Sequence, residues 1–325
     1  MNAPEVSVII ATRNRWPMLS SNALPSALGQ EGVELEIVVV DDASDDGTAE
    51  HVEALADSRV RVVRNETNRR LPASRNVGAE VARGTWLAFL DDDDLWSPRK
   101  VRAQIDAAEA SATSWVYAQC VVVDAELRPL DLHPSPAPEE LDELLRGGNH
   151  VPGGGSNVIV RAKAFDEIGR FDEGLRFFED WDLWLRLVQV ALPAACPDVL
   201  VARVEHGSNM LFRDEADIGA TFERILAKHG PVSDGQRQAV AEWIAHEHMR
   251  AGFNLRAARY YARAAVAYRS PGNAAAAAGA LFGRRGLSAA SRLLVATRGA
   301  THLEEAALPD PPEAPEWLAA FRPAD

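Results

Sequence analysis

Cysteine is nearly absent from this sequence of 325 residues, which has only Cys120 and Cys196. Each lies in an apolar stretch, which favours buried thiols in a reducing compartment over a disulfide or a metal pair. No apolar run reaches the ~20 residues of a membrane-spanning helix, and no signal-peptide pattern precedes the first apolar stretch. We therefore expect a cytoplasmic protein, at most peripheral to the inner face of a membrane.

Positive charge is also in short supply. The 34 Lys and Arg residues are outnumbered by 48 Asp and Glu residues, which gives a formal net charge of −14. Proteins that bind nucleic acid carry a basic surface, so this balance argues against a nucleic-acid partner. It is still compatible with an anionic nucleotide held locally by arginine and a metal. The hydrophobic fraction of 47% is typical of a soluble globular protein.

The first half of the chain alternates between short apolar runs and helical segments. The runs are rich in β-branched residues, as buried strands are. Such alternation predicts right-handed crossovers and an α/β fold with a mostly parallel sheet. The expected strands are 6–10, 36–40, 60–63 and 86–90, and the expected helices are 17–30, 45–56, 72–82 and 98–110.

The rest of the chain changes character twice. The middle predicts strands at 115–123 and 157–160, a proline-rich loop at 129–138, and helices at 139–146 and from Glu179 onward. From about residue 214 alanine becomes frequent and strand patterns end. We expect three parts: an α/β domain over 1–213, a helical region over 214–305, and a flexible tail rich in proline and acid over 306–325.

Four consecutive aspartates, Asp91 to Asp94, follow the expected strand 86–90. At the carboxyl end of a strand in an open α/β sheet they lie where ligands bind. Crowded carboxylates repel one another unless solvent or a cation neutralises them, and their oxygens are ligands that Mg²⁺ and Mn²⁺ prefer. A solvated acidic loop is the alternative. Ser97 and Pro98, typical of a helix N-terminus, hold the acids in a short turn and favour a ligand site.

Two further polar segments, 11–15 and 41–45, follow other strands of the expected sheet. Because the carboxyl ends of parallel strands meet at one edge, we expect both segments to converge with the aspartates on one rim. A cleft that combines arginine with carboxylates suits a metal-bridged phosphate group.

Five motifs, in their order and spacing, resemble those of one enzyme family. They are VSVIIATRNR (6–15), EIVVVDDASDDGT (36–48), ASRNVGA (73–79), WLAFLDDDDLWSP (86–98) and FEDWDLWL (178–185). Together they are similar to the family 2 glycosyltransferases with the GT-A fold, over residues 5 to 210. The resemblance implies an inverting transfer of a sugar from a nucleoside diphosphate donor.

The resemblance also implies a divalent cation, Mn²⁺ or Mg²⁺, held by Asp91 and Asp93. Such a cation neutralises charge on the leaving diphosphate. Asp92 is implied as a contact to the donor's ribose or sugar, whereas Asp94 is expected to serve the following helix, whose N-terminus favours negative charge. His206 is a further candidate metal ligand or diphosphate contact, with a structural histidine as the alternative.

The acceptor side follows from the same resemblance. Asp180 matches the general base that takes the proton of the acceptor hydroxyl, with helix capping as the alternative. The spacing of Trp181 and Trp184 favours core packing over contact with a sugar. Glycine permits the close approach of a substrate. The acceptor-side candidates are Gly154, Gly155, Ser156, Glu179 and Trp181.

The nucleotide is expected along the first two strands. Asp42 resembles the acid that accepts a hydrogen bond from the base, and Arg13 is expected near the phosphate or the base. Arg75 is expected to pair with the diphosphate or with the acids, with a surface salt bridge as the alternative. The nucleotide-binding candidates are Ala11, Thr12, Arg13, Arg15, Asp42, Arg75 and Asp92.

Two patterns of related enzymes are missing from the sequence. Processive members of the family carry a Gln-x-x-Arg-Trp motif and transmembrane helices, so their absence favours transfer of a single sugar. The glycine-rich start of sugar nucleotidyltransferases is also absent. The expected partners are a UDP, GDP or dTDP sugar and a sugar or lipid-linked acceptor, in cell-surface polysaccharide, glycolipid or natural-product glycosylation. A sugar-nucleotide-binding scaffold without turnover and a sugar-phosphate nucleotidyltransferase are the alternatives, and the oligomeric state is open.

Overall fold

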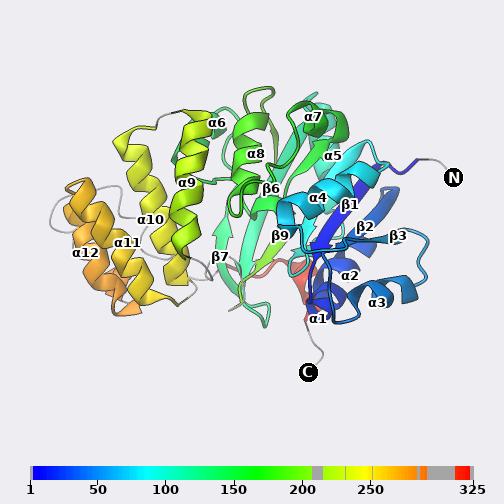
Figure 1. Ribbon diagram of the computed structural model, residues 1–325, viewed down its shortest axis with the longest axis horizontal. Helices are drawn as coiled ribbons and strands as arrows, with labels where there is room; N and C mark the ends of the chain where they lie inside the picture. Colours follow the sequence, from blue (N-terminus) through cyan, green and yellow to red (C-terminus); the bar gives the residue numbers. More distant parts are fainter. Residues whose placement is uncertain are drawn as a thin grey trace.

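The computed structural model describes residues 3–206, 215–230, 232–250, 252–283, 286–290 and 312–322. One mixed sheet of nine strands forms the centre, with helices on both faces and further helices beyond one end (Figure 1). The strand order is β3-β2-β1-β4-β8-β6-β9-β5, with β7 paired to β6. The arrangement confirms the α/β fold and the helical C-terminal region that the sequence predicts.

The strands bring three chain segments together at one edge. The nine strands of the sheet are β1 (Val6–Thr12), β2 (Leu35–Asp41), β3 (Val60–Arg64), β4 (Trp86–Asp91), β5 (Leu95–Trp96), β6 (Trp115–Val123), β7 (Pro129–His133), β8 (Ile159–Arg161) and β9 (Ala194–Val204). β1, β2, β3 and β4 run parallel, whereas β8 is antiparallel to β4. The register pairs Thr12 with Asp41 and Ala11 with Asp91. The carboxyl ends of β1, β2 and β4 therefore lie side by side, as expected.

Alternate residues of the central strands face two separate cores. Ile9 and Phe89 pack with residues of α7 and α8, whereas Val8 and Ile10 pack with α2 and α5. Because both faces are covered, these strands consist of nearly continuous apolar runs. The helices of this part are α1 (Trp16–Met18), α2 (Leu24–Leu28), α3 (Thr48–Ala54), α4 (Arg70–Val81), α5 (Lys100–Ala110), α6 (Leu141–Gly147), α7 (Ala162–Glu167) and α8 (Glu179–Leu187).

Two segments differ from the expectation. The helix expected over 17–30 is divided into α1, a π-helical turn at Leu19–Ala23 and α2. Pro25 explains part of this, since it has no N–H to donate to the carbonyl four residues earlier. The loop expected over 129–138 begins with strand β7, which pairs antiparallel with β6. As an edge strand β7 can begin with Pro129, because proline is tolerated there.

The C-terminal helices continue the core of the α/β part. They are α9 (Glu215–His229), α10 (Asp234–Arg250), α11 (Asn254–Ala267) and α12 (Pro271–Ala280). Phe222 of α9 stacks on Trp181 of α8 at 6.0 Å between ring centroids. Lys228 and His229, at the end of α9, bond the carboxylate of Asp182 in α8. The helical region is thus joined to the sheet domain by apolar and ionic contacts.

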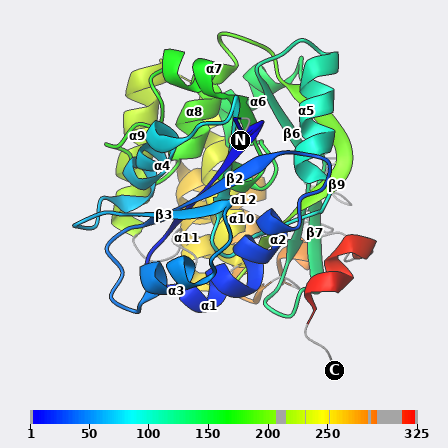
Figure 2. The same cartoon turned by 90° about the vertical axis from the view of Figure 1, so that its right-hand side faces the viewer.

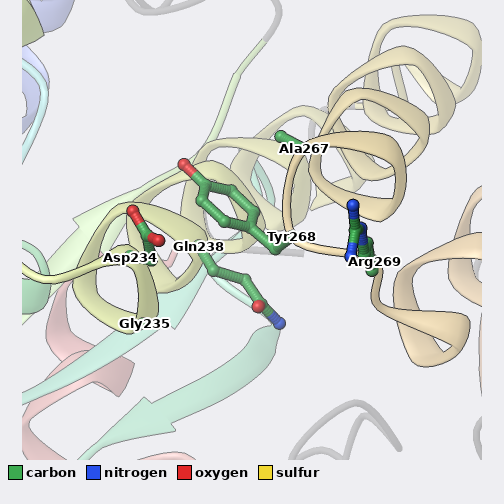
Figure 3. A pocket seen from close by; sticks show the side chains of 6 residues that line it. All are labelled: Asp234, Gly235, Gln238, Ala267, Tyr268 and Arg269. Carbon is green, nitrogen blue, oxygen red and sulfur yellow. The ribbon is translucent and has the colours of Figure 1, made fainter.

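The surface of the helical region has a shallow cavity of about 300 Å³ between the start of α10 and the end of α11 (Figure 3). Its lining residues are Asp234, Gly235, Gln238, Ala267, Tyr268 and Arg269. Among the helices in the described ranges, none combines the length and the apolarity required to cross a bilayer.

The segment expected to be a flexible tail contains a 3-10 helix at Glu316–Phe321, which lies near β7 and β9 (Figure 2). Trp317 Nε1 donates a hydrogen bond of 2.9 Å to the carbonyl of Val199 in β9. Leu318 is fully buried among residues of β5, β6 and β9. In its described part, this segment is therefore packed against the sheet and the expectation of a flexible tail is wrong there.

Candidate active site

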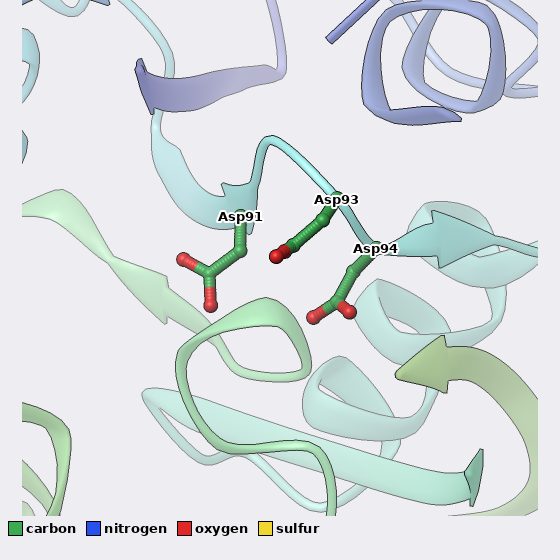
Figure 4. A group of neighbouring side chains, drawn as sticks. All are labelled: Asp91, Asp93 and Asp94. Atoms are coloured by element: carbon green, nitrogen blue, oxygen red, sulfur yellow. The ribbon is translucent and has the colours of Figure 1, made fainter. Parts of the chain in front are cut away.

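Asp91, Asp93 and Asp94 converge just beyond the end of β4 (Figure 4). One carboxylate oxygen from each lies within 4.8 Å of the other two. Hard oxygen ligands at this spacing suit Mg²⁺ or Mn²⁺, and a bound cation would remove the repulsion between the carboxylates. The residues present therefore fit the divalent cation implied by the sequence, with Asp94 as a third oxygen donor.

Asp92 is bonded to the loop that follows β1. Its carboxylate accepts a hydrogen bond of 2.7 Å from Thr12 Oγ1 and forms an ion pair of 2.9 Å with Arg15. Burial and the nearby charge of Asp93 raise the pKa of Asp92 to about 7, although Arg15 opposes them. Asp92 thus fixes the β1 loop on the rim, and its contact with the donor's ribose or sugar stays a prediction.

Asp93 is held by groups from two distant parts of the chain. Its Oδ2 lies 2.7 Å from Arg15 Nη2 and 2.7 Å from His206 Nε2. Burial alone would raise the pKa of Asp93, but the hydrogen bond with His206 and the charge of Arg15 lower it overall. His206, which follows β9, therefore lies beside the candidate metal ligand.

Asp94 does not serve the following helix, so that expectation is wrong. The helix α5 begins only at Lys100, and the Asp94 carboxylate bonds elsewhere. It accepts hydrogen bonds of 2.6 Å from Ser156 Oγ and 2.9 Å from the backbone N–H of Val204. Burial, supported by the neighbouring carboxylates, raises the pKa of Asp94 well above its ordinary value. Asp94 thus connects the glycine-rich loop at 153–156 and the end of β9 to the acidic turn, which consists of residues 91–94.

Arg75 of α4 connects the acidic turn with α8. Its Nη2 lies 2.5 Å from Asp91 Oδ1, and its Nη1 lies 3.0 Å from Glu179 Oε1. The side chain is 2% exposed, and a Cβ at Gly155 would come within 2.5 Å of Arg75 Nη2. Burial raises the pKa of Glu179 to about 7, with the charge of Arg75 opposing it. Of the pairings expected for Arg75, the one with the acids is therefore present.

Asp180 stands at the start of α8 and faces the glycine-rich loop. Its Oδ2 accepts a hydrogen bond of 2.9 Å from Asn149 Nδ2, and its Oδ1 accepts one of 2.7 Å from the backbone N–H of Trp181. Gly154 has a φ of 54°, and a Cβ there would lie 2.8 Å from Asp180 Oδ2. Burial raises the pKa of Asp180, with Arg75 opposing it. An oriented carboxylate with a raised pKa has the properties of a general base.

The loops that follow β1 and β2 are joined to each other at the rim. The backbone N–H of Asn14 donates to Ser44 Oγ at 2.9 Å, and Asn14 Oδ1 accepts from the backbone N–H of Asp45 at 2.8 Å. Asn14 has a φ of 54°, which asparagine tolerates better than most residues. The predicted nucleotide-binding residues on this rim are Ala11, Thr12, Arg13 and Arg15, of which Arg13 is exposed.

Asp42 directly follows β2, and its carboxylate forms hydrogen bonds with other residues of the chain. Its carboxylate accepts hydrogen bonds from Asn65 Nδ2 at 2.8 Å and from the backbone N–H groups of Arg69 at 2.8 Å and Arg70 at 2.9 Å. Asp42 therefore holds the loop that enters α4, and its contact with a base stays a prediction. A cavity of about 480 Å³ opens next to it, lined by Ala43, Arg64, Asn65 and Glu66.

The rim can be compared with known proteins. Residues 7–169 match the glycosyl transferase family 2, which is half of the chain. The chain belongs to this family. Its motifs and the geometry of its rim agree with that membership.

Two relatives show how far the sequence similarity extends. The succinoglycan biosynthesis protein ExoO of Rhizobium meliloti is 36% identical over 191 residues, which cover 55% of this chain and 54% of ExoO. The uncharacterized glycosyltransferase YwdF of Bacillus subtilis is 28% identical over 238 residues, which cover 70% of this chain and 84% of YwdF. The chain thus spans about half the length of ExoO.

A solved structure shows the same fold. S. aureus TarS 1-349, determined in complex with UDP-GlcNAc, superposes with a TM-score of 0.58 at 17% sequence identity. The match covers 94% of this chain and 88% of that one. The family 2 chain therefore has the GT-A fold, with its helical region included in the match.

One expectation for the acceptor side of this family 2 chain is wrong. Trp181 is 1% exposed, and its Nε1 donates a hydrogen bond of 2.7 Å to the carbonyl of Leu145. Its ring lies against Phe222 of α9. The structure therefore places Trp181 in the core, in agreement with its spacing from Trp184.

Two asparagines that brace the site were not found from the sequence. Asn22 Nδ2 donates a hydrogen bond of 2.7 Å to the backbone carbonyl of Asp93, and Asn149 orients Asp180. Asn22 follows Ser20 and Ser21 in a segment of mixed polarity, so the local pattern does not single it out. Asn149 lies in an irregular loop beyond α6, where nothing in the local pattern indicates its partner.

Proposed function

We propose that this protein catalyses the inverting transfer of a single sugar from a nucleoside diphosphate sugar to an acceptor hydroxyl. The observation that carries the proposal is the location of two acidic groups on one rim. One is the cluster of Asp91, Asp93 and Asp94, and the other is Asp180. Arg75 connects them, because it pairs with both Asp91 and Glu179.

The metal would be Mn²⁺ or Mg²⁺, held by Asp91 and Asp93 with Asp94 or His206 within reach. When bound, the cation supplies Lewis-acid neutralisation of the charge that develops on the departing diphosphate. Arg15, which already contacts Asp92 and Asp93, adds positive charge on the same side. The electrostatic character of the rim thus suits a diphosphate leaving group.

The nucleotide would lie over the joined loops after β1 and β2. A UDP sugar is favoured over a GDP or dTDP sugar, since TarS, which shares the fold, is described in complex with UDP-GlcNAc. The cavity next to Asp42 supports a base-binding role for this side of the rim. Arg13 is exposed there and is therefore accessible to a phosphate group.

Asp180 would act as the general base that takes the proton of the acceptor hydroxyl. The acceptor oxygen forms a bond to the anomeric carbon, the bond from that carbon to the diphosphate oxygen breaks, and the acceptor proton passes to the Asp180 carboxylate. Asn149 occupies one lone pair of Oδ2 and thereby orients the carboxylate. Gly154 and Gly155 carry no side chain that would block the approach of the acceptor, and their packing against Asp180 and Arg75 explains their presence.

The names of the relatives support one class of acceptor. ExoO is named for the biosynthesis of succinoglycan, so we place the reaction in the assembly of a cell-surface polysaccharide on a sugar or lipid-linked acceptor. The enzyme would then work in the cytoplasm, at the inner face of the membrane.

The test compares Asp180→Asn with Asp106→Asn, a matched change at an exposed acid in α5. Release of UDP, GDP or dTDP from the corresponding sugar nucleotides is measured with a saccharide or lipid-linked acceptor. We expect transfer by Asp180→Asn to fall by about 10²–10⁴-fold with nucleotide affinity preserved, because only the base is lost. A parallel loss of nucleotide affinity would assign Asp180 to binding, and wild-type turnover would refute its role.

A further inference from the structure

Charge is distributed very unevenly along this acidic chain. Residues 248–303 contain nine arginines and no lysine, aspartate or glutamate. The remainder of the chain has only 25 of the 34 basic residues and all 48 acidic ones. The net negative charge of the protein therefore comes from the residues outside 248–303, whereas the charged residues of this segment, which includes α11 and α12, are all arginines.

The exposed side of α11 combines this positive charge with apolar side chains. Leu255, Arg259, Ala262 and Val266 follow one another at helical spacing and are all exposed, with Leu255 at 60% and Val266 at 82%. Arg263 flanks this stripe. The opposite side of α11 is buried against neighbouring helices, so the exposed stripe has no packing partner among the described residues.

The end of α12 adds an aromatic residue next to the start of α11. Phe282 is 81% exposed and Leu281 53%. Gly283 lies against Asn254, which places Phe282 near the first turn of α11. The two helices form a hairpin at the end of the molecule opposite β3 (Figure 1). We define the hairpin surface by Leu255, Arg259, Arg263, Val266 and Phe282.

The described part of the chain does not neutralise the arginines of the hairpin surface. Within the described residues, no carboxylate forms an ion pair with Arg259 or Arg263, both of which are exposed. Contiguous exposed apolar patches commonly mark interaction sites, and a partner of this surface must meet apolar side chains and positive charge together. A bilayer that contains anionic lipid meets both, because negative headgroups lie directly above acyl chains and arginine can keep its head among the headgroups.

We propose that the hairpin surface docks on an anionic phospholipid membrane. The acidic sheet domain is repelled by the same lipids, so contact is confined to the hairpin end of the molecule. Because Leu255, Val266 and Phe282 are aliphatic or aromatic, they enter the interface while the arginines bind headgroup phosphates. The proposal depends on the hairpin alone and does not require that the transfer reaction proposed above is correct.

The experiment is co-sedimentation of the full chain with vesicles of phosphatidylcholine alone or mixed with phosphatidylglycerol. We expect binding only to the mixed vesicles, and its loss at high salt. Arg259→Glu changes the charge of the hairpin surface by two units. Each unit of charge near an anionic bilayer contributes about fivefold, so we expect this variant to bind about thirty-fold more weakly. Phe282→Ser should also weaken it, whereas Arg259→Lys should bind like the wild type.

Lys163→Glu is the matched control, because it makes the same change in net charge at an exposed site on α7. We expect it to bind vesicles like the wild type. Equal losses for Lys163→Glu and Arg259→Glu, or no preference for anionic vesicles, would overturn the proposal. Self-association without lipid that Arg259→Glu abolishes, together with no vesicle binding, would assign the surface to a second copy and also overturn it.

Discussion

Replacing Gly155 with alanine should damage the site through a single contact. The added Cβ would lie 2.5 Å from Arg75 Nη2 and 3.0 Å from its Cζ, where an ordinary contact needs more than 3.4 Å. Arg75 is buried and cannot turn away without stretching its contacts of 2.5 Å to Asp91 and 3.0 Å to Glu179. The guanidinium must therefore move by a substantial part of an ångström.

The expected cost follows from this displacement. Overpacking of a buried site typically costs about 1–3 kcal/mol, which corresponds to a Tm lower by about 2–10 °C. A misplacement near 1 Å in an active site can lower the rate by about 10²-fold. We therefore expect Gly155→Ala to lose about two orders of magnitude in kcat, because the displaced Arg75 no longer holds Asp91 and Glu179 in place.

Thermal unfolding and steady-state kinetics check this prediction. Gly235→Ala is the matched control, since a Cβ at Gly235 meets nothing closer than 3.8 Å and its φ is not positive. We expect the control to keep both Tm and kcat. If Gly155→Ala also kept both, the Arg75 bridge would not position the reacting groups and the reasoning would be refuted.

Two further predictions concern the junction between α8 and the C-terminal helices. Burial opposes ionisation of Asp182, but the hydrogen bonds with His229 and Lys228 and the charge of Arg186 lower its pKa to about 2. About 2–3 kcal/mol of stability, present above pH ~4, is therefore lost as the pH falls toward 2. Asp182→Asn should flatten the dependence of Tm on pH in that range, and an unchanged profile would count against the assignment. Trp181→Phe should lower stability by about 1–3 kcal/mol, because the Leu145 carbonyl loses its donor, with kcat and acceptor KM unchanged. A raised acceptor KM at unchanged Tm would instead put Trp181 at the acceptor.

The sequence predicts the sheet and its functional rim well because both depend on local patterns. Continuous β-branched runs mark strands that are buried on both faces, and the polar residues directly after them must meet at one edge. Asp93 and Arg15 are 78 positions apart, yet both follow such runs, and they lie 2.7 Å from each other in the structure. The C-terminal helices are also visible in the sequence because alanine-rich periodicity differs sharply from the strand pattern.

What the sequence does not predict depends on contacts between distant segments. The bond of Asp94 to Val204 spans 110 positions, and that of Asp180 to Asn149 starts from a loop without periodicity. The spacing of Trp181 and Trp184 favours core packing, but the local pattern does not show that the partner of Trp181 is Phe222 in α9. Likewise, the edge strand β7 begins with Pro129, a residue that by itself indicates a loop.

The central claim is that the acids at the end of β4 bind a divalent cation together with the diphosphate of the donor. Calorimetric titration of UDP into the protein, with Mn²⁺ and then with EDTA, tests it most directly, with Asp93→Asn and the control Asp106→Asn measured alongside. We predict that the wild type and Asp106→Asn bind UDP far more tightly with Mn²⁺ than with EDTA, and that Asp93→Asn loses this difference. Equal UDP affinity in all three proteins, with or without the metal, would contradict the account.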